Sequence, residues 1–140
     1  MVQATDVFIV GAGPAGLAVA ARRYGLQVMV ADAAAPPIDK TCGEGLLRDS
    51  LDALGRLGLV LERSDGYKLR GIQFFDGAAA PRAYFPAGQG RGLRRKTLHE
   101  KLIRHASHCG VCILWRTRVT GLSKDEVLVD GTRVRARWIV

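Results

Sequence analysis

The chain has 140 residues, 48% of them hydrophobic, and a formal net charge of +8 from 21 Lys and Arg against 13 Asp and Glu. This length and composition are typical of one globular domain with its own core. The apolar run over residues 7–21 is interrupted by Gly and Pro and is too short to cross a bilayer, so no membrane span is expected. The N-terminus lacks the charged and apolar regions of a signal peptide, which favours a cytoplasmic protein.

The positive charge has no pattern of a nucleic-acid-binding surface. Basic residues are spread over most of the chain, and the dense cluster Arg94-Arg95-Lys96 opens a predicted helix. No aromatic residues interleave with this cluster, as a surface that stacks nucleic-acid bases requires. We therefore expect no nucleic-acid partner, and we assign part of the positive charge to an anionic cofactor.

The N-terminal segment has the pattern of a dinucleotide-binding βαβ unit. A strand is predicted over residues 7–10, a helix over residues 14–24 that ends at Gly25, and a second strand over residues 27–31 that leads to Asp32. The turn between the first strand and the helix reads Gly-Ala-Gly-Pro-Ala-Gly. The acid lies at about the separation expected of a residue that binds a ribose diol. This order of elements predicts a site for a dinucleotide such as FAD or NAD(P).

Each residue of the glycine turn has its own physical role. Gly11 allows a tight turn at the end of the strand, and Gly13 lets a pyrophosphate approach the backbone. Gly16 lets the helix pack closely on the sheet. Pro14 and Ala15 open the helix, where N–H groups without helical partners face the phosphates.

The middle of the chain is predicted to contain two helices and several strands. A loop is predicted over residues 33–40, followed by a helix over 46–57 with Gly58 as its cap. Two strands, over 68–75 and 82–85, are followed by a flexible glycine connection at 88–92. An amphipathic helix over 94–109 and a strand over 111–115 complete this part. Leucines at helical spacing support the first of these helices. The strand over 111–115 is expected to be the third strand of a parallel sheet.

The C-terminal part is predicted as a small antiparallel meander. Its strands cover residues 119–122, 126–129 and 133–135. Residues 138–140 read as a further, buried strand. Domains usually end in exposed polar segments, so we expect the chain to be the N-terminal part of a longer protein, truncated at residue 140. The predicted fold class is α/β, with a Rossmann-like parallel sheet, a βαβ dinucleotide-binding unit, an inserted strand pair and the meander.

The three cysteines are interpreted as reduced thiols, because their number is odd. Cys109 and Cys112 form a Cys-x-x-Cys motif that follows His105 and His108. Such a cluster is compatible with a zinc site or a redox pair. We favour the alternative, a helix end followed by a buried strand in which Cys112 is a small apolar residue, because no second ligand pair follows. No metal is expected.

Four blocks of sequence carry a family resemblance. They are the glycine turn with Asp32, Lys-Thr-Cys-Gly-Glu-Gly-Leu at residues 40–46, Gly-Leu-Arg-Arg-Lys-Thr-Leu-His at residues 92–99, and Val-Thr-Gly-Leu at residues 119–122 with the meander that follows. The chain thus resembles the N-terminal FAD-binding part of the FAD-dependent monooxygenase superfamily. This is the aromatic-hydroxylase type, which also includes geranylgeranyl reductases and flavin-dependent halogenases.

The resemblance implies a set of cofactor-binding residues. FAD is expected at the glycine turn and Asp32, with Arg95 beside it to pair with phosphate oxygens, whereas Arg94 and Lys96 are expected at the surface. Backbone near Val119 is expected to face the adenine. The remaining cofactor-binding residues implied by the resemblance come from the block at residues 40–46 and are Lys40, Cys42 and Gly43.

In that block, Gly43 allows backbone to approach a flat ring system. Two other residues of the block, Cys42 and Glu44, keep alternative interpretations. Cys42 either lies near the flavin or is a small buried residue. Glu44 either acts on a substrate proton or, as we favour, is a solvated loop charge.

The resemblance also implies a function. The predicted protein is the FAD-binding part of a flavin-dependent oxidoreductase, monooxygenase-like, with NAD(P)H as transient reductant and a small molecule as substrate. The strand pair within residues 68–86 is expected to face that substrate. The alternatives are an NAD-binding Rossmann domain of a dehydrogenase and a truncated fragment without catalysis. No catalytic residue and no oligomeric state are assigned.

Overall fold

The computed structural model describes residues 3–22, 24–86 and 88–140. The chain forms two compact units. The first contains Met1–Asp39 and Leu98–Val140, and the second contains Lys40–Thr97. The second unit is therefore inserted in sequence between the two halves of the first.

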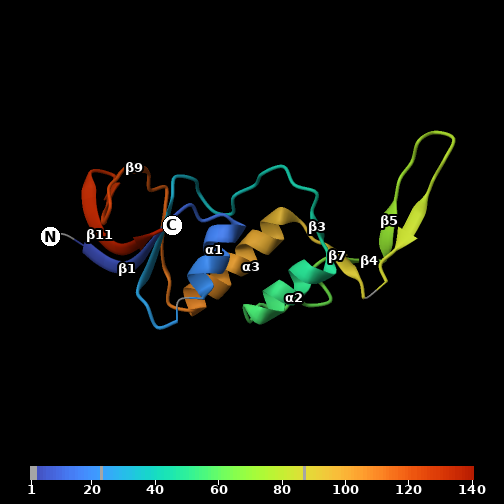
Figure 1. The fold of residues 1–140 in the computed structure, drawn as a ribbon, viewed down its shortest axis with the longest axis horizontal. Helices are drawn as coiled ribbons and strands as arrows, with labels where there is room; N and C mark the ends of the chain where they lie inside the picture. The colour runs from blue at the N-terminus through green and yellow to red at the C-terminus, as the bar shows by residue number, and fades with distance from the viewer. Residues whose placement is uncertain (1–2, 23, 87) are drawn as a thin grey trace. The chain divides into compact units, whose positions relative to one another are not determined.

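A six-stranded sheet forms the centre of the first unit, with the strands in the order β8-β2-β1-β11-β10-β9. Figure 1 labels β1, β9 and β11 of this sheet. The parallel strands are β8 (Cys112–Trp115), β2 (Val28–Asp32), β1 (Gln3–Val10) and β11 (Thr132–Ile139). The antiparallel strands beyond β11 are β10 (Glu126–Val129) and β9 (Val119–Leu122). The predicted parallel sheet with an antiparallel meander is confirmed.

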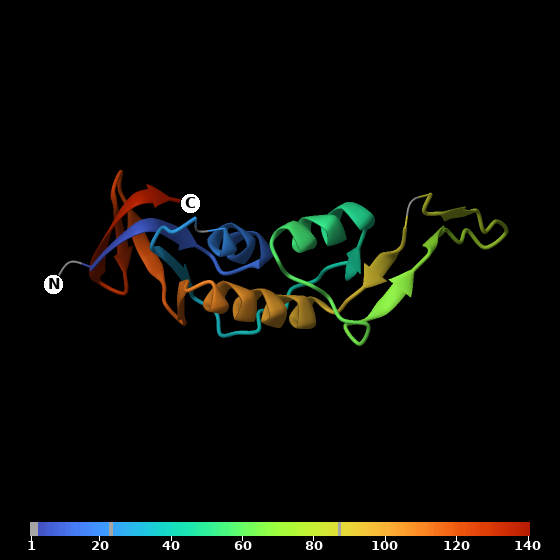
Figure 2. The ribbon, with the colours of Figure 1, turned by 90° about the horizontal axis from the view of Figure 1, so that it is seen from below.

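Two helices connect the parallel strands of this unit. α1 (Pro14–Ala21) follows β1 and packs against β1 and β2, and α3 (Arg95–His108) precedes β8 and runs as one continuous helix (Figure 2). α1 ends before the predicted residue 24, because Tyr24 has a φ of 45° and has left the helical conformation. Arg23, which the prediction included, lies outside the described residues.

The core of the first unit lies on the sheet and includes the meander. One cluster of buried residues comes from β1, β2, β10 and β11, and its members are Phe8, Ala31, Val127, Val129, Val134 and Ala136. Further buried residues come from the helices of this unit, among them Leu17 and Ala20 of α1 and Leu102 and Ala106 of α3. In β10 the buried positions alternate with less buried ones, which is the two-residue period of a strand. The meander is therefore an integral part of the core.

β11 replaces two separately predicted strands. It pairs antiparallel with β10 over its first half and parallel with β1 along its length. Val134 and Ala136 are buried, but Trp138 and Val140 are each 59% exposed, so the predicted burial is wrong at these two positions. Ile139, between them, is half-buried and packs against the core cluster. Alternation places Trp138 on the same face as Val134 and Ala136. Within the described residues, that face is not covered at Trp138.

The second unit contains short strands in two small sheets and one helix. In the first sheet, β7 (Gly90–Gly92) lies between β3 (Gly45–Leu46) and β4 (Tyr67–Leu69). In the second, β5 (Gly71–Gln73) pairs antiparallel with β6 (Arg82–Tyr84). The helix is α2 (Arg48–Arg56), two residues shorter at its start than predicted because Leu46 belongs to β3.

Two predictions for this unit are wrong in detail. The strand predicted over residues 68–75 is split at Arg70 between β4 and β5, which belong to different sheets. The predicted flexible connection at residues 88–92 contains β7, the middle strand of a sheet. Glycine suits this strand because a Cβ on Gly90 would lie 2.8 Å from the carbonyl oxygen of Leu46. Gly90 therefore allows close strand packing here.

Glu44, the residue before β3, holds the start of α3. Its Oε1 accepts a hydrogen bond from the N–H of Arg95 at 3.0 Å, and its carbonyl oxygen accepts one from the N–H of Leu93 at 2.7 Å. The N–H groups of a first helical turn have no partner inside the helix, and a carboxylate there also meets the positive end of the helix dipole. Neither sequence interpretation of Glu44 contained this capping role.

Among the helices of the described part of the chain, none combines the length and the apolar character that crossing a membrane requires.

Replacing Gly16 should destabilise the first unit. A Cβ at this position would overlap the carbonyl oxygen of Gly11 and lie 3.3 Å from Cγ2 of Ile9, so α1 must shift on the sheet. We expect Gly16→Ala to lower the free energy of unfolding by about 1–3 kcal/mol. Urea denaturation measures this change. Gly13→Ala is the matched control, because its Cβ would meet no atom within 4 Å; equal losses in both variants would contradict the packing role of Gly16.

Removing the carboxylate of Glu44 should weaken the start of α3. We expect Glu44→Ala to lower the free energy of unfolding by about 1 kcal/mol, as for other helix-capping side chains. Glu44→Gln keeps an acceptor oxygen and should lose clearly less. Glu100→Ala, on the exposed surface of α3, is the control and should change stability by less than about 0.5 kcal/mol. A stability of Glu44→Ala equal to that of this control would exclude the cap.

Candidate functional site

The glycine turn joins β1 to α1 at the carboxyl end of the parallel strands. Gly11 has a φ of 110°, a conformation that favours glycine, and its N–H donates to the carbonyl oxygen of Ala31 at 2.8 Å. Gly13 has φ −69° and ψ 176° and is the N-cap of α1 without a side-chain cap. The turn is therefore held to β2 by backbone contacts.

The first turn of α1 contains backbone N–H groups that have no partner inside the helix. Pro14 has no N–H, and the first helical bond runs from the N–H of Leu17 to the carbonyl oxygen of Gly13 at 3.0 Å. Ala15 and Gly16 lie in this first turn, where N–H groups lack helical partners. The N–H of Gly13 has no hydrogen-bond partner within the part of the chain that the structure describes, and a Cβ there would meet no atom within 4 Å. This arrangement suits a phosphate.

Asp32 connects the glycine turn to the loop after β2. Its Oδ2 accepts a hydrogen bond from the N–H of Ala12 at 2.9 Å, and its Oδ1 accepts one from the N–H of Ala34 at 2.8 Å. The sequence assigned this carboxylate to a ribose diol alone. Each carboxylate oxygen has a second lone pair, so contacts with the backbone leave acceptor capacity for two hydroxyl groups.

The segment that precedes Val119 is hydrogen-bonded to Asp32 and to the loop that follows it. The N–H of Thr117 donates to the carbonyl oxygen of Asp32 at 2.9 Å, and the N–H of Arg116 donates to that of Ala34 at 3.2 Å. Val119 is the first residue of β9, and its side chain packs against the core. In the sheet it pairs with Val129 of β10.

The predicted cofactor residues at 40–43 belong to the second unit. Lys40, Cys42 and Gly43 are all exposed, and a Cβ at Gly43 would meet no atom within 4 Å. The N–H of Glu44 donates to Sγ of Cys42 at 3.2 Å. The interpretation of Cys42 as a small buried residue is therefore wrong.

Arg95 differs from the basic residues on either side of it. Arg94 and Lys96 are exposed, as expected, whereas Arg95 is half-buried. Nε of Arg95 is buried and has no hydrogen-bond partner among the described residues. A buried donor without a partner is costly, and a guanidinium is well suited to phosphate oxygens. This donor therefore fits an anionic ligand.

His99 contacts the glycine turn, although no sequence pattern predicted this contact. Its ring is fully buried on α3. Nδ1 accepts a hydrogen bond from the N–H of Ile38 at 3.0 Å, and Nε2 lies 2.6 Å from the carbonyl oxygen of Ala12. The ring also meets Trp115 edge-on, at 5.9 Å between centroids. The only sequence signal was its place in the block at residues 92–99.

The Cys-x-x-Cys motif does not form a metal site with its neighbours. Cys109 Sγ lies 3.9 Å from Nε2 of His105, and Cys112 is exposed on β8, so its predicted burial is wrong. In the described part of the chain, no three His, Cys, Asp or Glu side chains come together in a way that could hold a metal ion.

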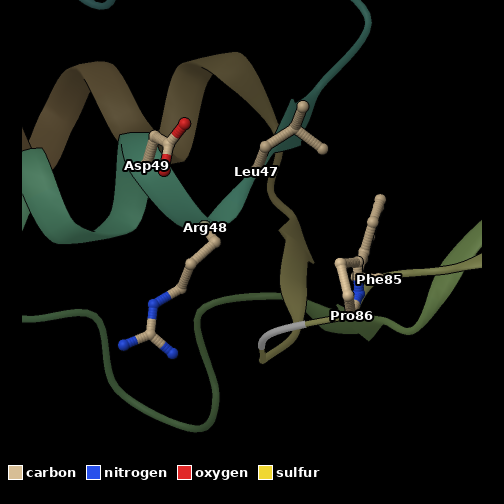
Figure 3. Close-up of a pocket in the computed structure, with 5 residues that line it drawn as sticks. All are labelled: Leu47, Arg48, Asp49, Phe85 and Pro86. Atoms are coloured by element: carbon tan, nitrogen blue, oxygen red, sulfur yellow. The ribbon is translucent and has the colours of Figure 1, made fainter.

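A hollow of about 290 Å³ in the second unit lies apart from the predicted site residues. Its lining residues are Leu47, Arg48, Asp49, Phe85 and Pro86 (Figure 3). Figure 3 shows the Arg48 side chain extending away from Phe85, and Nε of Arg48 pairs with Asp52 at 3.0 Å. The polar groups do not converge on a common point, so this hollow lacks the character of a specific ligand site.

Known proteins support the assignment that this geometry suggests. Residues 4–138 match the family described as FAD binding domain. Over 152 aligned positions the chain is 33% identical to a menaquinone reductase of Mycobacterium tuberculosis, covering 99% of this chain and 37% of that protein. It is 32% identical to a rifampicin monooxygenase of Rhodococcus hoagii, covering 97% of this chain and 31% of that protein. The chain thus spans about a third of the length of these relatives.

Solved structures share the fold. A myxobacterial chondrochloren halogenase superimposes with a TM-score of 0.85 at 22% identity, covering 98% of this chain and 36% of that one. A geranylgeranyl bacteriochlorophyll reductase-like protein of Thermoplasma acidophilum gives a TM-score of 0.79 at 20% identity, covering 99% of this chain and 39% of that one. Because the family match extends over nearly the whole chain, this protein belongs to the FAD binding domain family, as an N-terminal FAD-binding part of the FAD-dependent monooxygenase superfamily.

Proposed function

We propose that this chain binds FAD at the glycine turn and is the FAD-binding part of a flavin-dependent oxidoreductase. One observation carries the proposal: at the N-terminus of α1 the N–H of Gly13 has no partner among the described residues, and a Cβ on Gly13 would meet no atom within 4 Å. The helix dipole also favours an anion at this end of the helix. The Asp32 carboxylate is hydrogen-bonded to the same turn. A pyrophosphate and its adjoining ribose require such a pair of groups.

Each site residue has a proposed task toward the cofactor. Gly13 and Ala15 donate backbone N–H groups to the pyrophosphate, and Asp32 accepts from the ribose hydroxyls with its remaining lone pairs. The backbone of Val119 binds the adenine. These tasks use backbone and carboxylate groups whose positions are set by β1, β2, α1 and β9.

Arg95 is proposed to pair with a phosphate oxygen. Its buried and unpartnered Nε supports this task, because an anionic oxygen would satisfy the donor. Arg95 also lies four residues before His99 on α3, which places both on one side of the helix. In the second unit, exposed Lys40, Cys42 and Gly43 are proposed to contact the flavin part of the cofactor.

The proposed activity of the whole protein follows from this cofactor. FAD supplies two-electron redox chemistry when bound, and we propose NAD(P)H as its transient reductant. Relatives described as a menaquinone reductase and a rifampicin monooxygenase support an oxidoreductase acting on a small molecule. The exposed aromatic residues Phe74, Phe75 and Tyr84, around the β5–β6 pair, are proposed to face that substrate. The cytoplasmic location expected from the sequence remains part of the proposal.

Gly13→Val should abolish cofactor uptake. The purified 140-residue chain is titrated with FAD, and quenching of flavin fluorescence gives the dissociation constant. A β-branched side chain at Gly13 would occupy the space proposed for pyrophosphate, so we expect Kd to rise by about 100-fold or more, a loss of roughly 3 kcal/mol.

Gly55→Val on α2 is the matched control for this substitution, because a Cβ there also meets no atom within 4 Å. Unchanged FAD affinity in Gly13→Val would contradict the phosphate site. If the wild-type chain does not bind FAD but is stabilised by NADH, the chain is an NAD-binding domain and the proposal is wrong.

Arg95→Ala should weaken FAD binding more than Arg94→Ala. Losing a charged hydrogen bond costs about 1.5–3 kcal/mol, which corresponds to an increase of about 10- to 100-fold in Kd. Arg94 is exposed, and its removal should change Kd by less than about threefold once ionic strength is fixed. Equal losses in the two variants would remove Arg95 from the site and leave only a general effect of charge.

A further inference from the structure

We infer that His99 is a positioning residue for the glycine turn: its imidazole holds the Ala12 carbonyl so that the N–H of Gly13 points to the ligand. The inference concerns the turn itself, and its consequence for affinity rests on the proposed FAD binding. His99 is 0% exposed and lies between two separate loops of the first unit. It contacts both loops through backbone groups only.

The contacts of His99 define the tautomer of its ring. Nδ1 accepts a hydrogen bond from the N–H of Ile38 at 3.0 Å, and a nitrogen that accepts carries no proton. The ring proton is then on Nε2, which donates to the carbonyl oxygen of Ala12 at 2.6 Å. The Trp115 ring also contacts the imidazole in a T-shaped arrangement, at an interplanar angle of 79°. The donor is therefore fixed in both chemical state and direction.

Ala12 is held on both sides of its α-carbon. Its N–H donates to Asp32 Oδ2 at 2.9 Å, and its carbonyl oxygen accepts from His99. In a trans peptide the carbonyl and the following N–H point in opposite directions. Fixing the Ala12 carbonyl toward His99 thus directs the N–H of Gly13 away from the ring. This N–H is the donor without a partner among the described residues.

If His99 only stabilises the core, its substitutions should have different effects from those expected if it positions the glycine turn. A histidine that only fills the core would affect stability, whichever of its two hydrogen bonds is lost. A positioning residue should affect the turn only when the bond to Ala12 is lost. Two amide side chains separate these cases, because Gln places an N–H near the position of Nε2, while Asn places an oxygen near that of Nδ1.

The first measurement needs no cofactor. In the ¹⁵N-labelled 140-residue chain, we expect imidazole shifts of a ring protonated at Nε2 and unprotonated at Nδ1. His99→Asn should move the Gly13 amide resonance, and His99→Gln should leave it near its wild-type position. Leu102→Ala, one turn along α3 and also buried, controls for destabilisation and should not move it. A proton on Nδ1, or equal Gly13 shifts in the two His99 variants, would overturn the inference.

The second measurement is FAD affinity by fluorescence titration. We expect His99→Asn to raise Kd about tenfold, and His99→Gln and Leu102→Ala to raise it by less than about threefold. Equal losses with Gln and Asn would contradict the positioning role. If the wild-type chain takes up no FAD, the proposed function fails, whereas the resonance of Gly13 and the ring tautomer still decide the role of His99.

Discussion

The hydrogen bond between Ala12 and Asp32 is the constraint on which the candidate site depends. It joins the turn after β1 to the end of β2, so the two strands that carry the site cannot move independently. The same carboxylate also accepts from Ala34. His99 completes the arrangement from α3 by holding the other side of the Ala12 peptide. The site is therefore built from backbone groups that side chains orient, and few side chains are left to contact a ligand directly.

Local signals made the first part of the fold predictable from sequence. The glycine turn, the helix after it and the acid at the end of β2 lie within residues 3–32, where short-range steric rules decide the structure. The difference between Arg95 and its neighbours was also predicted and agrees with their exposure. α3 and β8 came within one residue of their predicted bounds, because each has a regular apolar pattern.

The remaining features depend on contacts between distant residues, which no local pattern reveals. Glu44 caps a helix that begins 51 residues later, and His99 contacts a carbonyl 87 residues before it. The split at Arg70 between β4 and β5 also arises from pairing, since β4 joins β7 and β5 joins β6. The glycines at residues 88–92 were interpreted as a flexible connection, but Gly90 allows two strands to pack closely. In each case contacts between residues that are distant in sequence decide the structure, and local propensity does not describe them.

The position of β1 between β2 and β11 has a consequence for synthesis on the ribosome. β1 is made first, but its partner β11 spans Thr132–Ile139, so one edge of β1 stays open until almost the whole described chain has emerged. Unpaired strand edges are prone to wrong association, and pairing over such a separation in sequence is slow. A nascent chain of this protein is thus exposed to wrong association throughout the interval between the synthesis of β1 and that of β11, which includes the synthesis of the whole second unit.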